Sequence, residues 1–241
     1  MTLSTEHQLT LLRIAEQLSS HGLEVGLGGS SMLAAHGLAE QPRDLDLLVA
    51  LPDADAAHEL LQQLGRSERL EPKEPYCSRF FVLYTIGRVE VDLIGGFGIR
   101  HDAGIYRLDW RRRSDDAVLQ LATDANHSDD TALQLATDVS HSDNAALELA
   151  VDTDRSVVPS LQLTAQPGRS VSVTLTPLED WYVLYLLLPG QGAAGKAARI
   201  ERYWREQRGL RPDVLRAALH RELPPHVRQQ LEQLLAELGC C

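Results

Sequence analysis

The sequence predicts an α+β fold: a mixed sheet flanked by helices, with a helical C-terminal part and an inserted segment built on a 14-residue repeat. Strand-forming runs alternate with helical patterns in residues 1–110, the repeat follows, and leucine and alanine recur at helical spacing after residue 176. These three observations divide the chain into a core at 1–110, an insertion with a hairpin at 111–176 and a helical part at 177–241.

The composition is that of a globular protein without a general affinity for nucleic acid. Of its 241 residues 44% are hydrophobic, which is enough to bury a full core. Its formal net charge of −11 opposes binding to phosphate backbones, which clustered Lys and Arg must neutralise. The basic residues Arg107 and 111–113 could hold an RNA end, although such a run usually forms a solvated face.

Localisation is inferred from patterns that the sequence lacks. Three cysteines without regular spacing indicate a reducing compartment and no disulfide framework. The N-terminal residues show no signal-peptide pattern, and the most apolar run, 181–188, is far shorter than the roughly 20 residues of a membrane span. We therefore expect a cytoplasmic protein that does not associate with membranes.

The first elements follow from periodicity and turn residues. Apolar residues at helical spacing over 9–18 predict a helix that follows a possible cap at 4–6 and ends at 21–22. The run at 23–27 predicts a strand that ends in a glycine turn. A second strand is expected at 44–49, followed by a helix at 53–64. The polar, proline-punctuated segment 66–75 is expected to be a loop or a weak edge strand.

The glycine turn is the first candidate for ligand binding. Gly28 and Gly29 allow positive φ and leave no Cβ between the backbone and a ligand, so consecutive N–H groups can converge on an anion. Ser30 or Ser31 is expected to cap a short helix at 32–36. The N-terminus of a helix carries partial positive charge and free N–H groups, so it commonly binds phosphate.

Two carboxylates lie on the second strand. Asp44 and Asp46 alternate with apolar residues, so they project from one side of the strand about 6 to 7 Å apart. Such a pair can hold two divalent ions that clamp the oxygens of a phosphoryl transfer. A third carboxylate is expected on a neighbouring strand, and Asp92 supplies it. Each motif also has an interpretation without a ligand. The aspartates could lie on a solvated strand edge, and the glycines could form a plain connection between a strand and a helix.

A pair of strands is expected next, at 77–86 and 88–94, around a glycine turn. Arg79, at the start of this pair, is placed either to reach a triphosphate or to lie on the plain surface. A flexible exit is expected at 95–98 and a further short strand at 105–110.

Three near-identical copies of the repeat occupy 114–154. Solenoid repeats use longer units, so a tandem duplication is the simpler interpretation. Each copy fits a short helix or a short strand followed by a turn, and we favour strands.

A hairpin is expected at 161–176 around Pro167 and Gly168. Turn chemistry explains the aspartates of the repeat without calcium, because the EF-hand pattern is missing.

The C-terminal part is expected to consist of helices. Leucine or alanine stripes that belong in a core define four of them, at 177–188, 193–206, 212–221 and 225–238. Acidic residues in the first turn of the first helix suit its dipole.

The Gly-Gly-Ser turn, the Asp-x-Asp strand and the later strand aspartate, in this order, resemble the polymerase-beta-like nucleotidyltransferase superfamily. Its minimal bacterial members, such as antibiotic nucleotidyltransferases and nucleotidyltransferase-type toxins of toxin–antitoxin and abortive-infection systems, are the nearest in pattern. The resemblance covers residues 20–95 with specific motifs and 177–206 with diffuse ones, and the repeat has no counterpart in it.

The resemblance implies a nucleotidyltransferase-like sheet and a Mg²⁺-dependent transfer of a nucleoside monophosphate from an NTP, such as ATP, to a hydroxyl acceptor, with release of pyrophosphate. The residues implied to bind the nucleotide are Gly28, Gly29, Ser30, Ser31, Arg43 and Lys196. Two magnesium ions would be held by Asp44, Asp46 and Asp92. The acceptor side would include Glu179 and Arg79. On residue chemistry alone, Lys196 could equally be a solvated lysine and Glu179 a simple helix-start acid.

The acceptor stays open at this stage. A small molecule such as an antibiotic, a tRNA end and a protein side chain would each use a cleft between the sheet and the helical part. The competing hypothesis is a catalytically silent nucleotide-binding or antitoxin-like protein on the same fold, with the acidic repeat as its interaction surface. A third hypothesis is a calcium-binding adhesion module.

Overall fold

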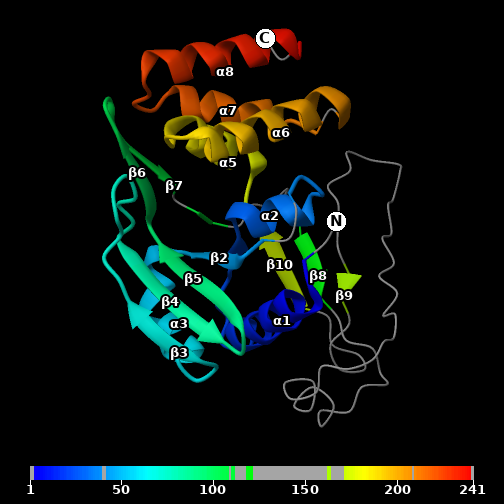
Figure 1. Ribbon diagram of the computed structural model, residues 1–241, viewed down its shortest axis with the longest axis vertical. Helices are drawn as coiled ribbons and strands as arrows, with labels where there is room; N and C mark the ends of the chain where they lie inside the picture. Colours follow the sequence, from blue (N-terminus) through cyan, green and yellow to red (C-terminus); the bar gives the residue numbers. More distant parts are fainter. Residues whose placement is uncertain are drawn as a thin grey trace.

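The computed structural model describes residues 3–39, 42–108, 110–111, 118–121, 162–163, 171–207 and 209–239. Within these residues the α+β prediction is confirmed: a mixed sheet, flanking helices and a C-terminal group of helices (Figure 1). In chain order the elements are α1 (Thr5–Ser19), β1 (Gly26–Leu27), α2 (Gly29–Ala35), β2 (Asp44–Val49), the 3-10 turn η1 (Leu51–Asp53), α3 (Ala54–Leu61), β3 (Arg66–Arg69), β4 (Phe80–Ile86), β5 (Val89–Gly95), β6 (Phe97–His101), β7 (Gly104–Leu108), β8 (Val118–Leu121), β9 (Gln162–Leu163), β10 (Val171–Leu175), α5 (Leu178–Leu187), α6 (Gln191–Gln207), α7 (Pro212–Leu219) and α8 (Pro225–Glu237).

The main sheet is mixed at its centre. Among the described residues its strands follow the order β3-β4-β5-β2-β1-β10-β8-β9. Strand β2 runs parallel to β5 and antiparallel to β1, and β1 runs parallel to β10. Strands β6 and β7 form a separate antiparallel pair that continues from β5 toward the C-terminal helices (Figure 1).

The two faces of β2 and β5 have different partners. Leu45 and Leu47 on β2 and Val91 on β5 have no exposed surface. Ala54 of α3 lies against Gly95 on this side, and α1 also contacts both strands. The opposite face is therefore directed toward α2 and the C-terminal helices, which Figure 1 shows stacked beyond α2.

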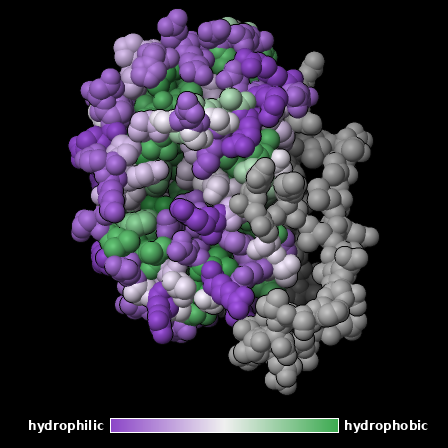
Figure 2. Space-filling view, in the orientation of Figure 1, coloured by the Kyte–Doolittle hydropathy of each residue, from purple (hydrophilic) through white to green (hydrophobic). Residues whose placement is uncertain are grey.

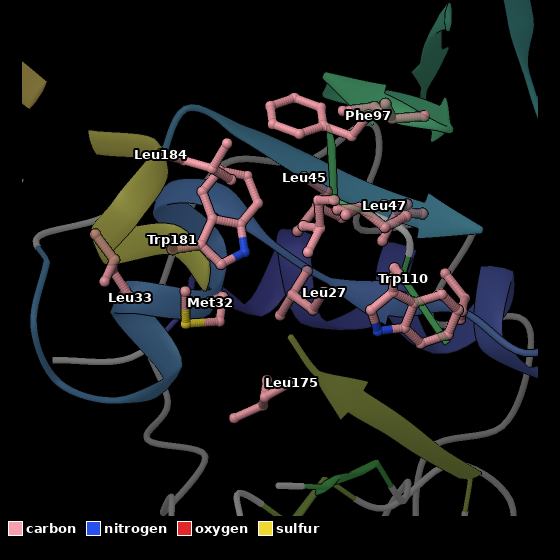
Figure 3. Close-up of a cluster of buried hydrophobic side chains, with 14 of the residues drawn as sticks. Leu27, Met32, Leu33, Leu45, Leu47, Phe97, Trp110, Leu175, Trp181 and Leu184 are labelled. Carbon is pink, nitrogen blue, oxygen red and sulfur yellow. The ribbon is translucent and has the colours of Figure 1, made fainter. Parts of the chain in front are cut away.

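One hydrophobic core joins the sheet to the helices above it. Figure 3 shows Leu27 of β1, Met32 of α2, Leu175 of β10 and Trp181 of α5 in the same cluster. In Figure 2 hydrophilic residues cover most of the visible surface, and hydrophobic residues show in several separate patches between them. Packing of this kind fixes the position of α2 relative to β2.

Several predicted boundaries need correction. The first strand is only Gly26–Leu27, not 23–27, and the expected flexible exit at 95–98 instead contains the start of β6. The predicted hairpin at 161–176 is wrong in the described residues, because β9 and β10 do not pair with each other. Both pair with β8, which comes from the first repeat copy and lies between them.

The C-terminal helices agree with the prediction to within about two residues at each end. The polar segment after α3 contains β3, an exposed edge strand antiparallel to β4. None of the helices in the described part of the chain is long and apolar enough to cross a membrane. Most of the repeat, including the second and third copies, lies outside the described residues.

Candidate functional site

Three aspartates share one face of the sheet. In the parallel register of β2 and β5, Asp46 lies beside Asp92. Residues in register on adjacent strands point to the same side, and so do residues two apart on one strand. Asp44, Asp46 and Asp92 therefore project together from the face opposite the buried Leu45, and all three stay partly exposed.

The glycine turn is built against Asp46. The Gly28 N–H donates to the backbone oxygen of Asp46 over 2.8 Å, and the Ser30 N–H donates to the Asp46 carboxylate. Gly29 has a φ of 55°, and a Cβ there would overlap the same carboxylate. A Cβ on Gly28 would overlap the indole of Trp181. Both glycines are thus needed for close approach, but the expected positive φ is found only at Gly29, because Gly28 is extended with a φ of −121°.

The two serines act differently from the prediction. Helix α2 begins at Gly29 with Gly28 as its N-cap, and no side chain forms a capping hydrogen bond. The prediction that a serine caps a helix at 32–36 is therefore wrong. The Ser31 hydroxyl instead donates to the backbone oxygen of Asp44 over 2.5 Å, and Ser31 is fully buried. Ser31 thereby ties α2 to the start of β2, while Ser30 contributes its backbone N–H.

Burial and mutual repulsion raise the pKa values of two of the acids. Burial, followed by the charges of Asp44 and Asp92, raises the pKa of Asp46 from 3.8 to about 7, against the opposing effect of Lys196. Burial, followed by Asp44 and Glu90, raises the pKa of Asp92 to about 6. Carboxylates that resist ionisation in this way would be stabilised by a bound cation.

Cationic side chains stand at the edge of the aspartate group. The Arg43 Nη2 lies 3.7 Å from the Asp44 Oδ2, with 87% of the arginine side chain exposed. The Lys196 Nζ on α6 lies 5.1 Å from the centre of the Tyr185 ring. Because Lys196 also lowers the pKa of Asp46, its charge reaches the aspartates.

Three further residues near the aspartates were missed in the sequence. Burial, followed by the charge of Asp46, raises the pKa values of both Tyr76 and Tyr185, and Arg199 opposes this at Tyr185. Tyr76 is 42% exposed. Arg199 follows Lys196 at helical i+3 spacing, a signal that could have found it. No local pattern marks Tyr76, because its place depends on a bridge to Ile99.

The two residues assigned to the acceptor side have other neighbours. Glu179 is 2% exposed, accepts a hydrogen bond from the Arg211 N–H over 2.8 Å, and lies 3.5 Å from the Arg211 Nε. Burial raises the pKa of Glu179, and Arg211 acts against this. The Arg79 side chain lies close to Gly96, at the exit of β5.

A Glu179→Ala variant is expected to lose about 3 kcal/mol of unfolding free energy, because it removes one partner of a buried ion pair. Urea unfolding measures this. The matched control is Glu232→Ala, which truncates an exposed acid on α8 and should stay within about 0.5 kcal/mol of the parent protein. A loss below about 1 kcal/mol for Glu179→Ala would contradict a structural role for this pair.

The aspartates have the chemistry of a magnesium site. Carboxylate oxygens are the ligands that Mg²⁺ prefers, and Asp44, Asp46 and Asp92 are the residues that could hold it. In the described part of the chain no group of three or more Asp, Glu, His or Cys side chains is arranged so that these side chains alone could hold a metal ion. Mg²⁺ is commonly held by one or two carboxylates together with substrate phosphates, so the residues fit an ion that arrives with a nucleotide.

Comparison with known proteins finds solved structures that are only distantly similar to this chain. No protein family model matches the chain, and no curated protein matches it either. A Thermotoga maritima structure described provisionally as a nucleotidyltransferase is 14% identical and covers 86% of this chain and 97% of its own, with a TM-score of 0.46. The structure of ANT(2'')-Ia in complex with adenylyl-2''-tobramycin is 14% identical and covers 89% of this chain and 97% of its own, with a TM-score of 0.44. Likeness at this level carries no inference about activity.

Proposed function

We propose that the protein is a Mg²⁺-dependent nucleotidyltransferase that transfers a nucleoside monophosphate from an NTP to a hydroxyl acceptor. The observation that supports this most is the group of Asp44, Asp46 and Asp92 on one sheet face, directly beside a glycine turn. Burial and mutual repulsion raise the pKa values of Asp46 and Asp92, so the group favours a cation that offsets the repulsion.

The surrounding residues offer a place for the triphosphate. Lys196 and Arg199 stand on one side of α6, within electrostatic reach of Asp46 and Tyr185. A cavity of about 370 Å³ opens beside Arg199 and Arg202, one to two helical turns from Lys196. These cations would neutralise phosphate oxygens that the aspartates alone would repel.

The reaction requires one bond to form and one to break. The acceptor oxygen attacks the α-phosphorus, the bond from that phosphorus to the bridging oxygen breaks, and pyrophosphate leaves. In this proposal Asp92 takes the acceptor proton and passes it to solvent. Bound magnesium would lower the pKa of the acceptor hydroxyl and stabilise the charge on the leaving oxygens. Alignment of the two substrates then provides most of the rate.

The direct test is incubation of the full chain with each labelled NTP and Mg²⁺ in cell extract. Transfer of label to one molecular class, with pyrophosphate release, would support the proposal and identify the acceptor as a small molecule, an RNA or a protein. A panel of purified hydroxyl acceptors, including an aminoglycoside, would follow. Nucleotide binding without turnover in extract and across the panel would instead favour a catalytically silent nucleotide-binding protein.

A Lys196→Ala variant is expected to raise the KM for NTP about tenfold and to change kcat less, because it removes one charge from the triphosphate side. Steady-state pyrophosphate release measures both constants. Lys73→Ala is the matched control, since Lys73 is exposed on the loop before β4 and should leave both constants unchanged. An unchanged KM in Lys196→Ala would remove this lysine from the nucleotide site.

A further inference from the structure

A second group of positive charges lies in another part of the molecule. A cavity of about 460 Å³ has in its lining Arg79, Arg107, Arg221, Glu222, Gly96 and Leu51. Its arginines come from the loop before β4, from β7 and from the chain after α7. The whole chain has a net charge of −11, so an arginine-rich cavity is a local positive region on a negatively charged protein.

Two of the guanidinium groups are held by uncharged partners. The Arg107 Nη1 donates to the backbone oxygens of Cys77 and Gly96, both over 3.3 Å. The Arg221 Nη1 donates to the backbone oxygen of Arg107 over 2.5 Å, and its guanidinium carbon lies 4.8 Å from the centre of the Tyr106 ring. Carbonyl oxygens and an aromatic ring fix these side chains without neutralising their charge.

Arg79 is the third arginine of the group. Gly96 has a φ of 59°, and a Cβ there would lie 3.3 Å from the Cβ of Arg79, so glycine preserves the space beside the Arg79 stem. Among the described residues, no carboxylate pairs with Arg79, Arg107 or Arg221 within 4.0 Å. With three arginines against Glu222, the lining has an excess of two positive charges.

The cavity is separate from the aspartate group. Leu51 follows β2 and Gly96 follows β5, so this cavity lies at the C-terminal ends of both strands. Asp92 precedes Gly96 by four residues, which corresponds to roughly 13 Å at about 3.3 Å per strand residue. A phosphate bound here would therefore be distinct from phosphates bound at the glycine turn.

We propose that this cavity binds a phosphate group, either as a free phosphate ion or as the monoester end of a larger molecule. Guanidinium groups donate paired hydrogen bonds to phosphate oxygens, and those already held in place lose little freedom on binding. Three guanidinium groups from separate segments suit the tetrahedral oxygens of phosphate better than the two oxygens of a planar carboxylate. The site does not depend on nucleotidyl transfer.

The test is calorimetric titration of the full chain with inorganic phosphate, pyrophosphate and glycerol 3-phosphate, without divalent metal and at constant ionic strength. Saturable binding with one site per chain is expected. Arg79→Gln should weaken it about tenfold, and Glu222→Gln should strengthen it several-fold by removing the opposing charge. The matched control is Arg88→Gln, an exposed arginine at the far end of β4 and β5, which should leave the affinity unchanged. Melting temperatures check that each variant is folded.

The three probes also separate the two sources of phosphate. Tightest binding of inorganic phosphate or pyrophosphate would indicate a free ion, and tightest binding of glycerol 3-phosphate would indicate a monoester. Absence of saturable binding by all three probes would overturn the proposal. Binding that is lost in Lys196→Gln and kept in Arg79→Gln would overturn it as well, because the phosphate would then lie at the aspartate group. These titrations contain no NTP, so their failure leaves nucleotidyl transfer untouched.

Discussion

An Asp46→Asn variant is expected to lose nucleotidyl transfer by roughly 100- to 1,000-fold, the range typical for loss of one charge-stabilising group. Asp46 lies beside Asp92 in the sheet register and accepts the Ser30 N–H of the glycine turn, so it joins the proposed metal and phosphate positions. The uncharged amide keeps the shape of the side chain and removes the charge that a metal ion requires. Pyrophosphate release at saturating NTP and Mg²⁺ measures the loss.

The same substitution should stabilise the fold at neutral pH. In the unfolded chain the Asp46 carboxyl ionises near its ordinary pKa of 3.8, whereas in the folded protein the pKa is raised to about 7. Well below pH 3.8 the carboxyl is protonated in both states, and no stability is lost. As pH rises from about 4 through 7 the unfolded chain has already released this proton, so folding stability falls by up to about 3 kcal/mol.

Melting temperatures at pH 4 and pH 8 test this sign. We expect Asp46→Asn to match the parent protein at pH 4 and to melt several degrees higher at pH 8, and Mg²⁺ should raise the melting temperature of the parent more than that of the variant. Asp55→Asn, an exposed acid on α3, is the control and should show neither effect. A variant that is inactive and also less stable at pH 8 would mean that Asp46 serves the fold instead of the chemistry.

The part of the site that sequence could predict is the part built by local rules. Asp44 and Asp46 share a face because strand residues alternate, and this requires no knowledge of the partner strand. Asp92 could be placed on a strand from its apolar neighbours, while its position beside Asp46 depends on the parallel register of β2 and β5. The glycine turn was recognisable, but its closest contact, the Asp46 carboxylate, was not.

The errors arise where pairing joins distant segments. The segment 161–176 has a good turn sequence, yet β8 lies between its two strands in the sheet, so the local turn signal did not decide the pairing. Ser31 is fully buried and bonds to the start of β2, an arrangement that a capping rule cannot foresee. Arg107 was seen only as part of a basic run, because its cavity forms from segments that lie far apart in the sequence.

A Gly29→Ala variant is expected to lose both stability and nucleotidyl transfer. Gly29 has a φ of 55°, a conformation that costs alanine about 1 kcal/mol, and a Cβ would also overlap the Asp46 carboxylate. Gly22→Ala separates the two effects, since Gly22 has a φ of 72° with no atom within 4 Å of an added Cβ. We expect Gly22→Ala to lose about 1 kcal/mol and keep full activity, and Gly29→Ala to lose several kcal/mol and at least 100-fold in rate.

A double variant shows whether the contact with Asp46 is the cause. If the added methyl group acts by displacing the carboxylate, Gly29→Ala combined with Asp46→Ala should recover most of the stability lost by Gly29→Ala, because the carboxylate has been removed. Activity should remain lost, since the same residue is needed for metal binding. Urea unfolding and pyrophosphate release, measured on the two single variants and the double variant, give the coupling energy. Strictly additive losses would mean that Gly29 acts through its backbone conformation alone, and the glycine turn would then have no special fit to the aspartate group.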